Sequence, residues 1–73
     1  MANFSERVKE LRKERGLKQR ELAEICGRTL RGYQQYEYGE GYPEVPGLLF
    51  LAEYFDVSLD YLMGRTDKRE VNR

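Results

Sequence analysis

The chain has 73 residues, 40% hydrophobic and 36% charged, and its 13 Lys and Arg balance its 13 Asp and Glu at a formal net charge of zero. This length suits one small domain without deep cavities, and a single cysteine with no histidine predicts no disulfide framework, no metal site, no cofactor and no enzyme activity. No apolar run is long enough to cross a membrane and the N-terminus is charged, so we expect a cytoplasmic protein with no membrane contact.

Five helices are predicted in chain order, with no strand pattern and no internal repeat. They run from near Asn3 to Gly16, from about Lys18 to Ile25, from about Leu30 to Tyr38, from around Val45 through Phe55, and from Ser58 to Gly64. The fourth helix is expected to bury Leu48, Leu51, Ala52 and Phe55, and the fifth helix is expected to bury Leu59 and Leu62. The predicted fold class is therefore all-α: a compact five-helix domain over residues 4–66, followed by a flexible polar tail over residues 67–73.

The second and third helices are separated by a very short turn at Gly27. Glycine allows the left-handed backbone that a sharp exit from a helix needs, and Thr29 can cap the next helix by accepting a backbone N–H near Gly32. The small side chain of Ala23 leaves room for a helix packed across the turn. Two helices crossing steeply at so tight a turn form the unit that places a helix in the DNA major groove.

Four segments occur in order at compatible spacing: F-S-E-R-V-K-E-L-R, G-L-K-Q-R-E-L-A, Y-E-Y-G-E and L-A-E-Y-F-D-V-S-L-D-Y-L-M-G-R-T-D. With these segments the chain resembles the phage-repressor-like helix-turn-helix family (Cro/CI or Xre type) from near residue 4 to near residue 66. The resemblance implies a lambda-repressor-like DNA-binding domain whose recognition helix runs from about Leu30 to Tyr38.

The resemblance implies base contacts from the amino end of this helix. The exposed positions there are expected to be Leu30, Arg31, Gln34 and Gln35. Arg31 can pair with guanine O6 and N7, Gln35 can pair with adenine N6 and N7, and Leu30 can touch a thymine methyl. In the simpler interpretation, Arg31, Gln34 and Gln35 are ordinary solvated helix residues and Leu30 is partly buried in the core.

Phosphate contacts are expected around the second helix. Gln19 and Arg20 open that helix, where unpaired N–H groups suit a phosphate, and the resemblance implies that Gln19 clamps the DNA backbone. Lys18 and Arg28 add positive charge near the phosphates. The resemblance implies that the hydroxyl of Tyr38 can replace an amide that in the family often contacts a phosphate. The resemblance also implies a structural ion pair between Arg12 and Glu37.

Aromatic residues off the apolar stripe of the fourth helix suggest an interface. Phe50 and Tyr54 lie on its neighbouring face, with Tyr61 and Met63 nearby in sequence, and we interpret them as homodimer contacts. A larger core is the alternative. Tyr33 and Tyr36 are expected to pack inside the domain, with base stacking as the less favoured interpretation.

Charge is unevenly distributed along the chain. Residues 1–31 hold nine Lys or Arg and five Glu, whereas residues 32–64 hold six acids and no base. One face can therefore attract phosphates although the whole chain is neutral. The sequence favours a double-stranded DNA-binding transcriptional regulator, a repressor acting as a homodimer. The alternative is a protein-interaction or antitoxin-like accessory module that uses the helix-turn-helix as a scaffold.

Overall fold

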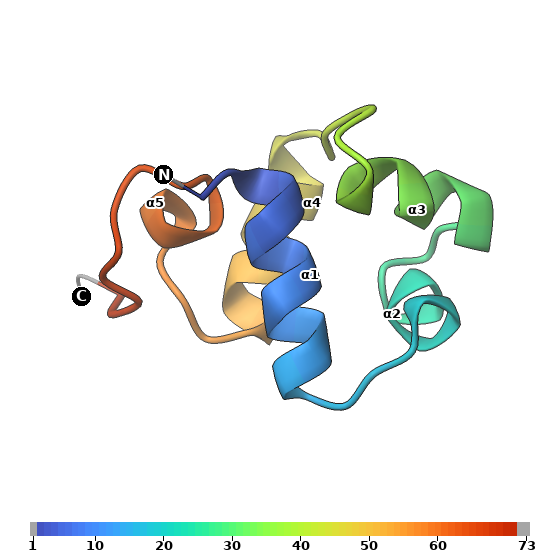
Figure 1. The fold of residues 1–73 in the computed structure, drawn as a ribbon, viewed down its shortest axis with the longest axis horizontal. Helices are drawn as coiled ribbons and strands as arrows, with labels where there is room; N and C mark the ends of the chain where they lie inside the picture. The colour runs from blue at the N-terminus through green and yellow to red at the C-terminus, as the bar shows by residue number, and fades with distance from the viewer. Residues whose placement is uncertain (1, 72–73) are drawn as a thin grey trace.

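The computed structural model describes residues 2–71, and within this range it contains helices and no strand. The helices are α1 (Phe4–Glu14), α2 (Gln19–Ile25), α3 (Leu30–Glu37), α4 (Val45–Tyr54) and α5 (Leu59–Leu62). Figure 1 shows α1 in the centre, with α2 and α3 on one side, α5 on the other and α4 behind. The predicted all-α, five-helix architecture is confirmed. None of these helices is both long and apolar enough to span a bilayer.

Side chains cap α1, α3 and α5, and the cap at Thr29 confirms the sequence prediction for the start of α3. Asn3 accepts the N–H of Glu6 at 3.0 Å, and Thr29 accepts the N–H of Gly32 at 3.0 Å. Ser58 accepts the N–H of Tyr61 at 2.9 Å. Each cap satisfies a backbone donor that the first turn of a helix leaves unpaired, so the starts of α1, α3 and α5 are encoded locally.

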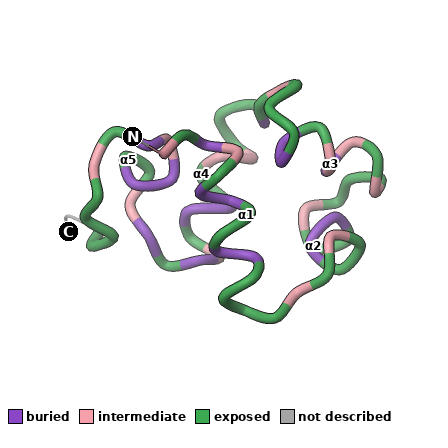
Figure 2. Tube along the Cα trace, in the orientation of Figure 1, coloured by how far each residue is buried: buried purple, intermediate pink, exposed green. Residues whose placement is uncertain are grey.

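The core lies between α1 and the other helices, where the buried stretches of the trace face inward (Figure 2). Its members are Phe4, Val8, Leu11, Leu22, Ala23, Tyr33, Tyr36, Leu51, Ala52, Phe55, Val57, Tyr61 and Leu62. The rings of Phe4 and Tyr36 meet edge to face at 6.1 Å between centroids, and those of Tyr33 and Tyr36 at 6.0 Å. The expected packing role of Tyr33 and Tyr36 is therefore confirmed.

Helix α5 presents a different face to the core from the one expected. Leu59 is 36% exposed, whereas Tyr61 is only 3% exposed. The inward direction lies between residues 61 and 62, which places Leu59 about a third of a turn to the side. The predicted burial of Leu59 is wrong, and so is the placement of Tyr61 on an exposed interface. The guanidinium of Arg7 lies 3.8 Å from the Tyr61 ring centroid, and the Tyr61 hydroxyl donates to Glu10 at 3.0 Å.

The described part of the C-terminal segment, which the sequence predicts to be a flexible tail, contacts α1 through its side chains. The N–H of Ser58 donates to the carbonyl of Arg69 at 2.8 Å. The Arg69 guanidinium contacts Glu14 at 2.5 Å and Glu10 at 2.9 Å, while Asp67 contacts Arg7 at 2.8 Å. The ion pairs join residues more than fifty positions apart, and no local sequence pattern encodes them. Residues 72 and 73 of the predicted tail lie outside the described range.

Gly64, in the turn after α5, provides a test of how closely this turn packs against the backbone of Ala2. Gly64 and Gly27 both have positive φ, +78° and +68°, but a Cβ at Gly64 would collide with the backbone of Ala2, whereas one at Gly27 would meet open space. Gly27→Ala is expected to lower the free energy of unfolding by about 1–2 kcal/mol, the cost of a left-handed L-residue. Gly64→Ala is expected to lose about 1–3 kcal/mol more, because the backbone must shift. Urea unfolding measures both, and equal losses would contradict the close contact.

Candidate nucleic-acid interface

The turn between α2 and α3 has the hydrogen bonds of a glycine-terminated helix. The N–H of Arg28 donates to the carbonyl of Ala23 at 2.8 Å, and the N–H of Gly27 donates to that of Glu24 at 3.0 Å. Ala23 is buried where α2 packs on α3. The turn, the Thr29 cap and the packing of the two helices agree with the helix-turn-helix unit that the sequence predicts.

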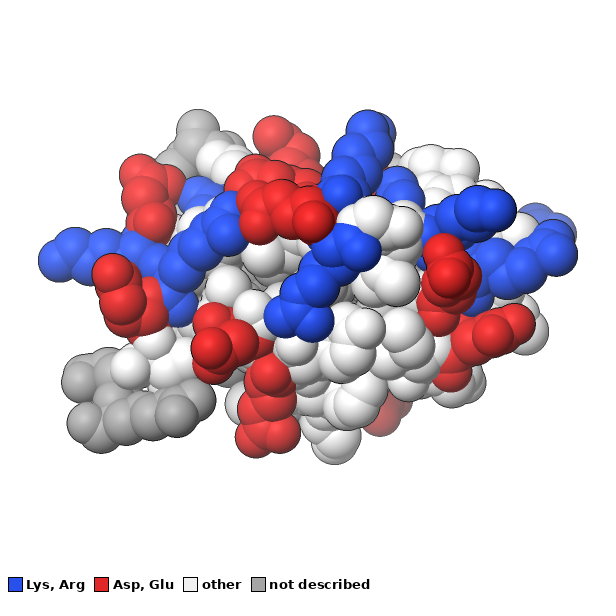
Figure 3. Space-filling view, turned by 90° about the horizontal axis from the view of Figure 1, so that it is seen from below, with Lys and Arg blue, Asp and Glu red and all other residues white. Residues whose placement is uncertain are grey.

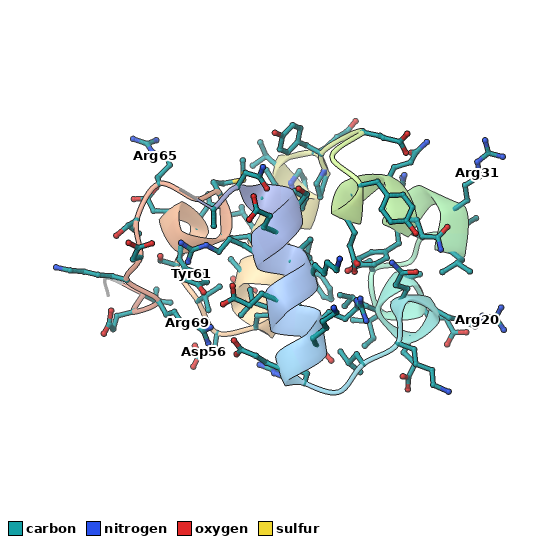
Figure 4. All side chains as sticks on the ribbon, in the orientation of Figure 1. Arg20, Arg31, Asp56, Tyr61, Arg65 and Arg69 are labelled. Carbon is teal, nitrogen blue, oxygen red and sulfur yellow. The ribbon has the colours of Figure 1, made fainter. Side chains whose placement is uncertain are left out.

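The four expected base-contacting residues lie on one side of α3, since they are spaced one, four and five positions from the first. Arg31 and Gln35 are exposed, whereas Leu30 and Gln34 are half-buried. Figure 4 shows Arg31 extending from the outer end of α3, and Arg20 of α2 extending in the same direction. A long, exposed guanidinium group therefore stands on each helix at this end of the molecule.

The expected phosphate-contacting residues surround this end, but they differ in their surroundings. Lys18, Arg20 and Tyr38 are exposed and Gln19 is half-buried. Arg28 is exposed as well, and its guanidinium lies 5.3 Å from the centroid of the Tyr36 ring. In addition, the carboxylate of Glu21 accepts the N–H of Lys18 at 2.8 Å. A negative charge thus already lies in the first turn of α2, close to the backbone N–H groups that would face a phosphate.

A buried carboxylate joins α1, α2 and α3. Glu37 Oε2 accepts from Arg12 Nε at 2.6 Å and from the hydroxyl of Tyr33, and Oε1 accepts from Arg12 Nη2 and Gln19 Nε2, both at 3.1 Å. The side chain of Glu37 is 1% exposed and that of Arg12 is 11% exposed. The structure therefore places the expected Arg12–Glu37 pair inside the domain. With Gln34, which bonds to Gln19, we call these five residues the Glu37 hub.

The hub keeps its charges. Burial raises the pKa of the Glu37 carboxyl, but hydrogen bonds from Arg12, Tyr33 and Gln19 outweigh it and hold that pKa below its usual value. The hydrogen bond to Glu37 raises the pKa of Arg12. Burial, followed by the bond to Glu37, raises the pKa of Tyr33. At neutral pH the hub is thus an ionised carboxylate surrounded by donors.

The charges that remain at the surface are mixed. Arg7 and Arg12, two of the bases in the basic half of the sequence, are buried in ion pairs. Figure 3 shows basic side chains at both ends and across the middle of one face, with acidic side chains among them. Arg65 and Arg69 lie at the end opposite Arg20 and Arg31 (Figure 4). The excess of bases early in the sequence is therefore not a simple basic face in space.

The expected dimer contacts separate into two groups. The rings of Phe50 and Tyr54 stack at 6.1 Å, and Phe50 is 42% exposed. Met63 is half-buried against the core, and Tyr61 belongs to the core. A second exposed apolar group was missed by the sequence reasoning: Leu49, Leu59 and Val71 border a hollow of about 500 Å³ beside α4 and α5. Leu49 lies one turn after Val45, and this spacing was the available signal.

Cys26 is half-buried at the end of α2, and burial raises the pKa of its thiol. The thiol is therefore protonated at neutral pH, which does not suit a nucleophile. Cys26 packs against the core as a small hydrophobic residue.

The helix-turn-helix family profile matches residues 8–62. The chain belongs to the phage-repressor-like helix-turn-helix family. It is 40% identical over 60 residues to YqaE of Bacillus subtilis, an uncharacterized HTH-type transcriptional regulator, covering 82% of this chain and 52% of YqaE. It is 36% identical over 69 residues to RstR, the cryptic phage CTXphi transcriptional repressor of Vibrio cholerae, covering 92% of this chain and 62% of RstR. The DNA-binding domain of the P22 C2 repressor superposes with a TM-score of 0.78 at 28% identity, covering 97% and 92% of the two chains. The chain thus spans little more than half of the length of YqaE and RstR.

The Glu37 hub predicts a large stability difference between two arginines of this helix-turn-helix domain. Arg12→Met removes the main partner of a buried carboxylate and is expected to lower the free energy of unfolding by about 3–5 kcal/mol. Arg69→Met removes an exposed ion pair with Glu10 and Glu14 and is expected to cost below about 1 kcal/mol. Urea unfolding at neutral pH compares them, and similar losses for both would show that the hub is not a buried charge pair.

The lowered pKa of Glu37 also makes stability depend on pH. Its stabilisation is complete above the ordinary Glu pKa of about 4.3 and is lost as the pH falls from there through the lowered pKa. Tyr33→Phe removes one hydrogen bond to the ionised carboxylate, so acid unfolding is expected to begin at a higher pH. Tyr36→Phe is the control, because its hydroxyl is not one of the four donors to Glu37. Circular dichroism between pH 6 and about pH 2 gives the midpoints, and equal shifts in the two variants would contradict this role.

Proposed function

We propose that this protein is a sequence-specific, double-stranded DNA-binding transcriptional regulator that places α3 in the major groove. The observation that carries the proposal is the exposed amino end of α3, with Arg31 and Gln35 on the side away from the core. The names of the relatives support it, since YqaE is an HTH-type transcriptional regulator and RstR a repressor. By analogy with RstR we propose repression, at the cytoplasmic nucleoid.

Two side chains supply most of the proposed base recognition. Arg31 presents a fork of N–H donors that fits guanine O6 and N7, and Gln35 presents a donor and an acceptor that fit adenine N7 and N6. Leu30 is half-buried and offers only apolar contact, for example with a thymine methyl. Gln19, Arg20, Lys18, Arg28 and Tyr38 are the proposed phosphate contacts, which fix the register of the domain without selecting a sequence.

We further propose that the protein binds as a homodimer. Phe50 and Tyr54 form a stacked, partly exposed pair on α4, and Leu49 and Leu59 add exposed apolar surface near it in sequence. Apolar surface of this kind is usually covered by a partner. A two-fold dimer reads two half-sites about one helical turn apart, so its DNA site has two-fold symmetry.

The test is selection from a random duplex library, followed by titration of the selected site at several salt concentrations. The wild-type protein is expected to enrich a two-fold-symmetric site, with an affinity that falls steeply with salt because each phosphate contact releases counterions. Arg31→Ala is expected to relax the preference at one base pair per half-site. The control is Arg65→Ala, which removes an exposed arginine at the opposite end of the molecule (Figure 4) and is expected to leave the selected sequence unchanged.

Two outcomes would contradict the proposal. If no sequence is enriched and weak binding disappears at physiological salt, the helix-turn-helix acts as a scaffold. The exposed apolar surface of α4 and α5 would then support a protein-interaction or antitoxin-like accessory module. If Arg31→Ala and Arg65→Ala alter the selected sequence equally, the protein does not read bases through the amino end of α3.

A further inference from the structure

Two glutamine amides extend the Glu37 hub toward the surface. Gln19 Nε2 donates to Glu37 Oε1 at 3.1 Å, and Gln34 Nε2 donates to Gln19 Oε1 at 3.0 Å. Gln19 is the first residue of α2, whereas Gln34 and Glu37 lie on α3. Both glutamines are half-buried. The chain of bonds therefore runs from a buried charge to side chains at the proposed DNA-binding surface.

The buried charge decides which way each amide faces. An ionised carboxylate can only accept hydrogen bonds, so Gln19 must turn its Nε2 toward Glu37. The Oε1 of Gln19 then faces Gln34, so Gln34 must donate a hydrogen bond to it from its own Nε2. Turning either amide around would place two acceptors against each other beside a negative charge in a poorly solvated site. Both orientations are thus determined by Glu37.

This arrangement separates Gln34 from its neighbour Gln35. Gln34 is half-buried and bonded to Gln19, whereas Gln35 is exposed. Gln19 in turn has used its Oε1 and one N–H, so its second N–H is what it can offer to a phosphate. We propose that Gln34 is a positioning residue that acts through Gln19, and not a base-reading residue. This inference rests on the proposed function.

A double-mutant cycle on the selected duplex tests the coupling. Gln34→Met keeps the length of the side chain but removes the donor to Gln19, and is expected to weaken binding by about two- to tenfold. In a Gln19→Met background the same change is expected to have no effect, since there is no amide left to position. Gln35→Met is the matched control on the next residue, and its effect is expected to be the same with and without Gln19.

Repeating the selection separates positioning from base reading. Gln34→Met is expected to return the wild-type site with the same preference at every position, because phosphate contacts carry no sequence information. Gln35→Met is expected to relax one position per half-site. Relaxation by Gln34→Met instead, or independent effects of Gln19→Met and Gln34→Met on affinity, would overturn the inference and leave the proposed function standing.

A measurement without DNA completes the test. The side-chain NH₂ protons of Gln19 are expected to exchange slowly with water in the wild-type protein and measurably faster in Gln34→Met, followed by ¹⁵N NMR on variants whose circular dichroism matches the wild type. Unchanged exchange would overturn the inference whatever the DNA results. If the wild-type protein enriches no duplex, the proposed function fails and this inference fails with it.

Discussion

The arrangement of α1, α2 and α3 depends on one buried carboxylate. Glu37 accepts four hydrogen bonds, which fill the acceptor sites of its two oxygens, and the donors come from Arg12, Gln19 and Tyr33. Arg12 also donates to the carbonyl of Leu17 at 2.8 Å and so fixes the connection between α1 and α2. Because one charge meets donors from three helices, none of these helices can rotate or slide without leaving that charge unsatisfied.

A buried ion pair is a costly way to join helices, since well-packed apolar side chains of similar volume often give equal or greater stability. The benefit of the Arg12–Glu37 pair is that its hydrogen bonds are directional. Hydrophobic contact is nondirectional, whereas a carboxylate requires a donor at each oxygen and thereby orients the groups around it. A helix-turn-helix has to present α3 at a defined rotation, because base edges accept hydrogen bonds only from well-placed donors. The Glu37 hub supplies that rotation from within the fold, so it links the stability of the domain to the surface it presents.

The elements that the sequence predicted well are those that a few neighbouring residues encode. Asn3, Thr29 and Ser58 each cap a helix through a residue three positions ahead, and such bonds can be inferred from spacing. The orientation of α5 and the course of the C-terminal segment could not be inferred from spacing. Arg69, for example, pairs with acidic residues 55 and 59 positions away. Which of many exposed charges will pair across such a distance depends on the assembled fold. The Arg12–Glu37 pair was expected only through the resemblance, and its extension to Gln19 and Gln34 required the structure.

The same contacts explain why the charge of the chain is a poor guide to its surface. The first 31 residues are rich in bases, yet Arg7 and Arg12 are buried in ion pairs within the domain. Attraction to phosphates therefore falls to a few exposed side chains at the α2–α3 end, such as Arg20 and Arg31 (Figure 4). With acidic groups close by and a net charge of zero, nonspecific binding to DNA is expected to be weak at physiological salt. Discrimination between DNA sequences then depends on the rigid placement of α3, and that placement depends on the buried carboxylate of Glu37.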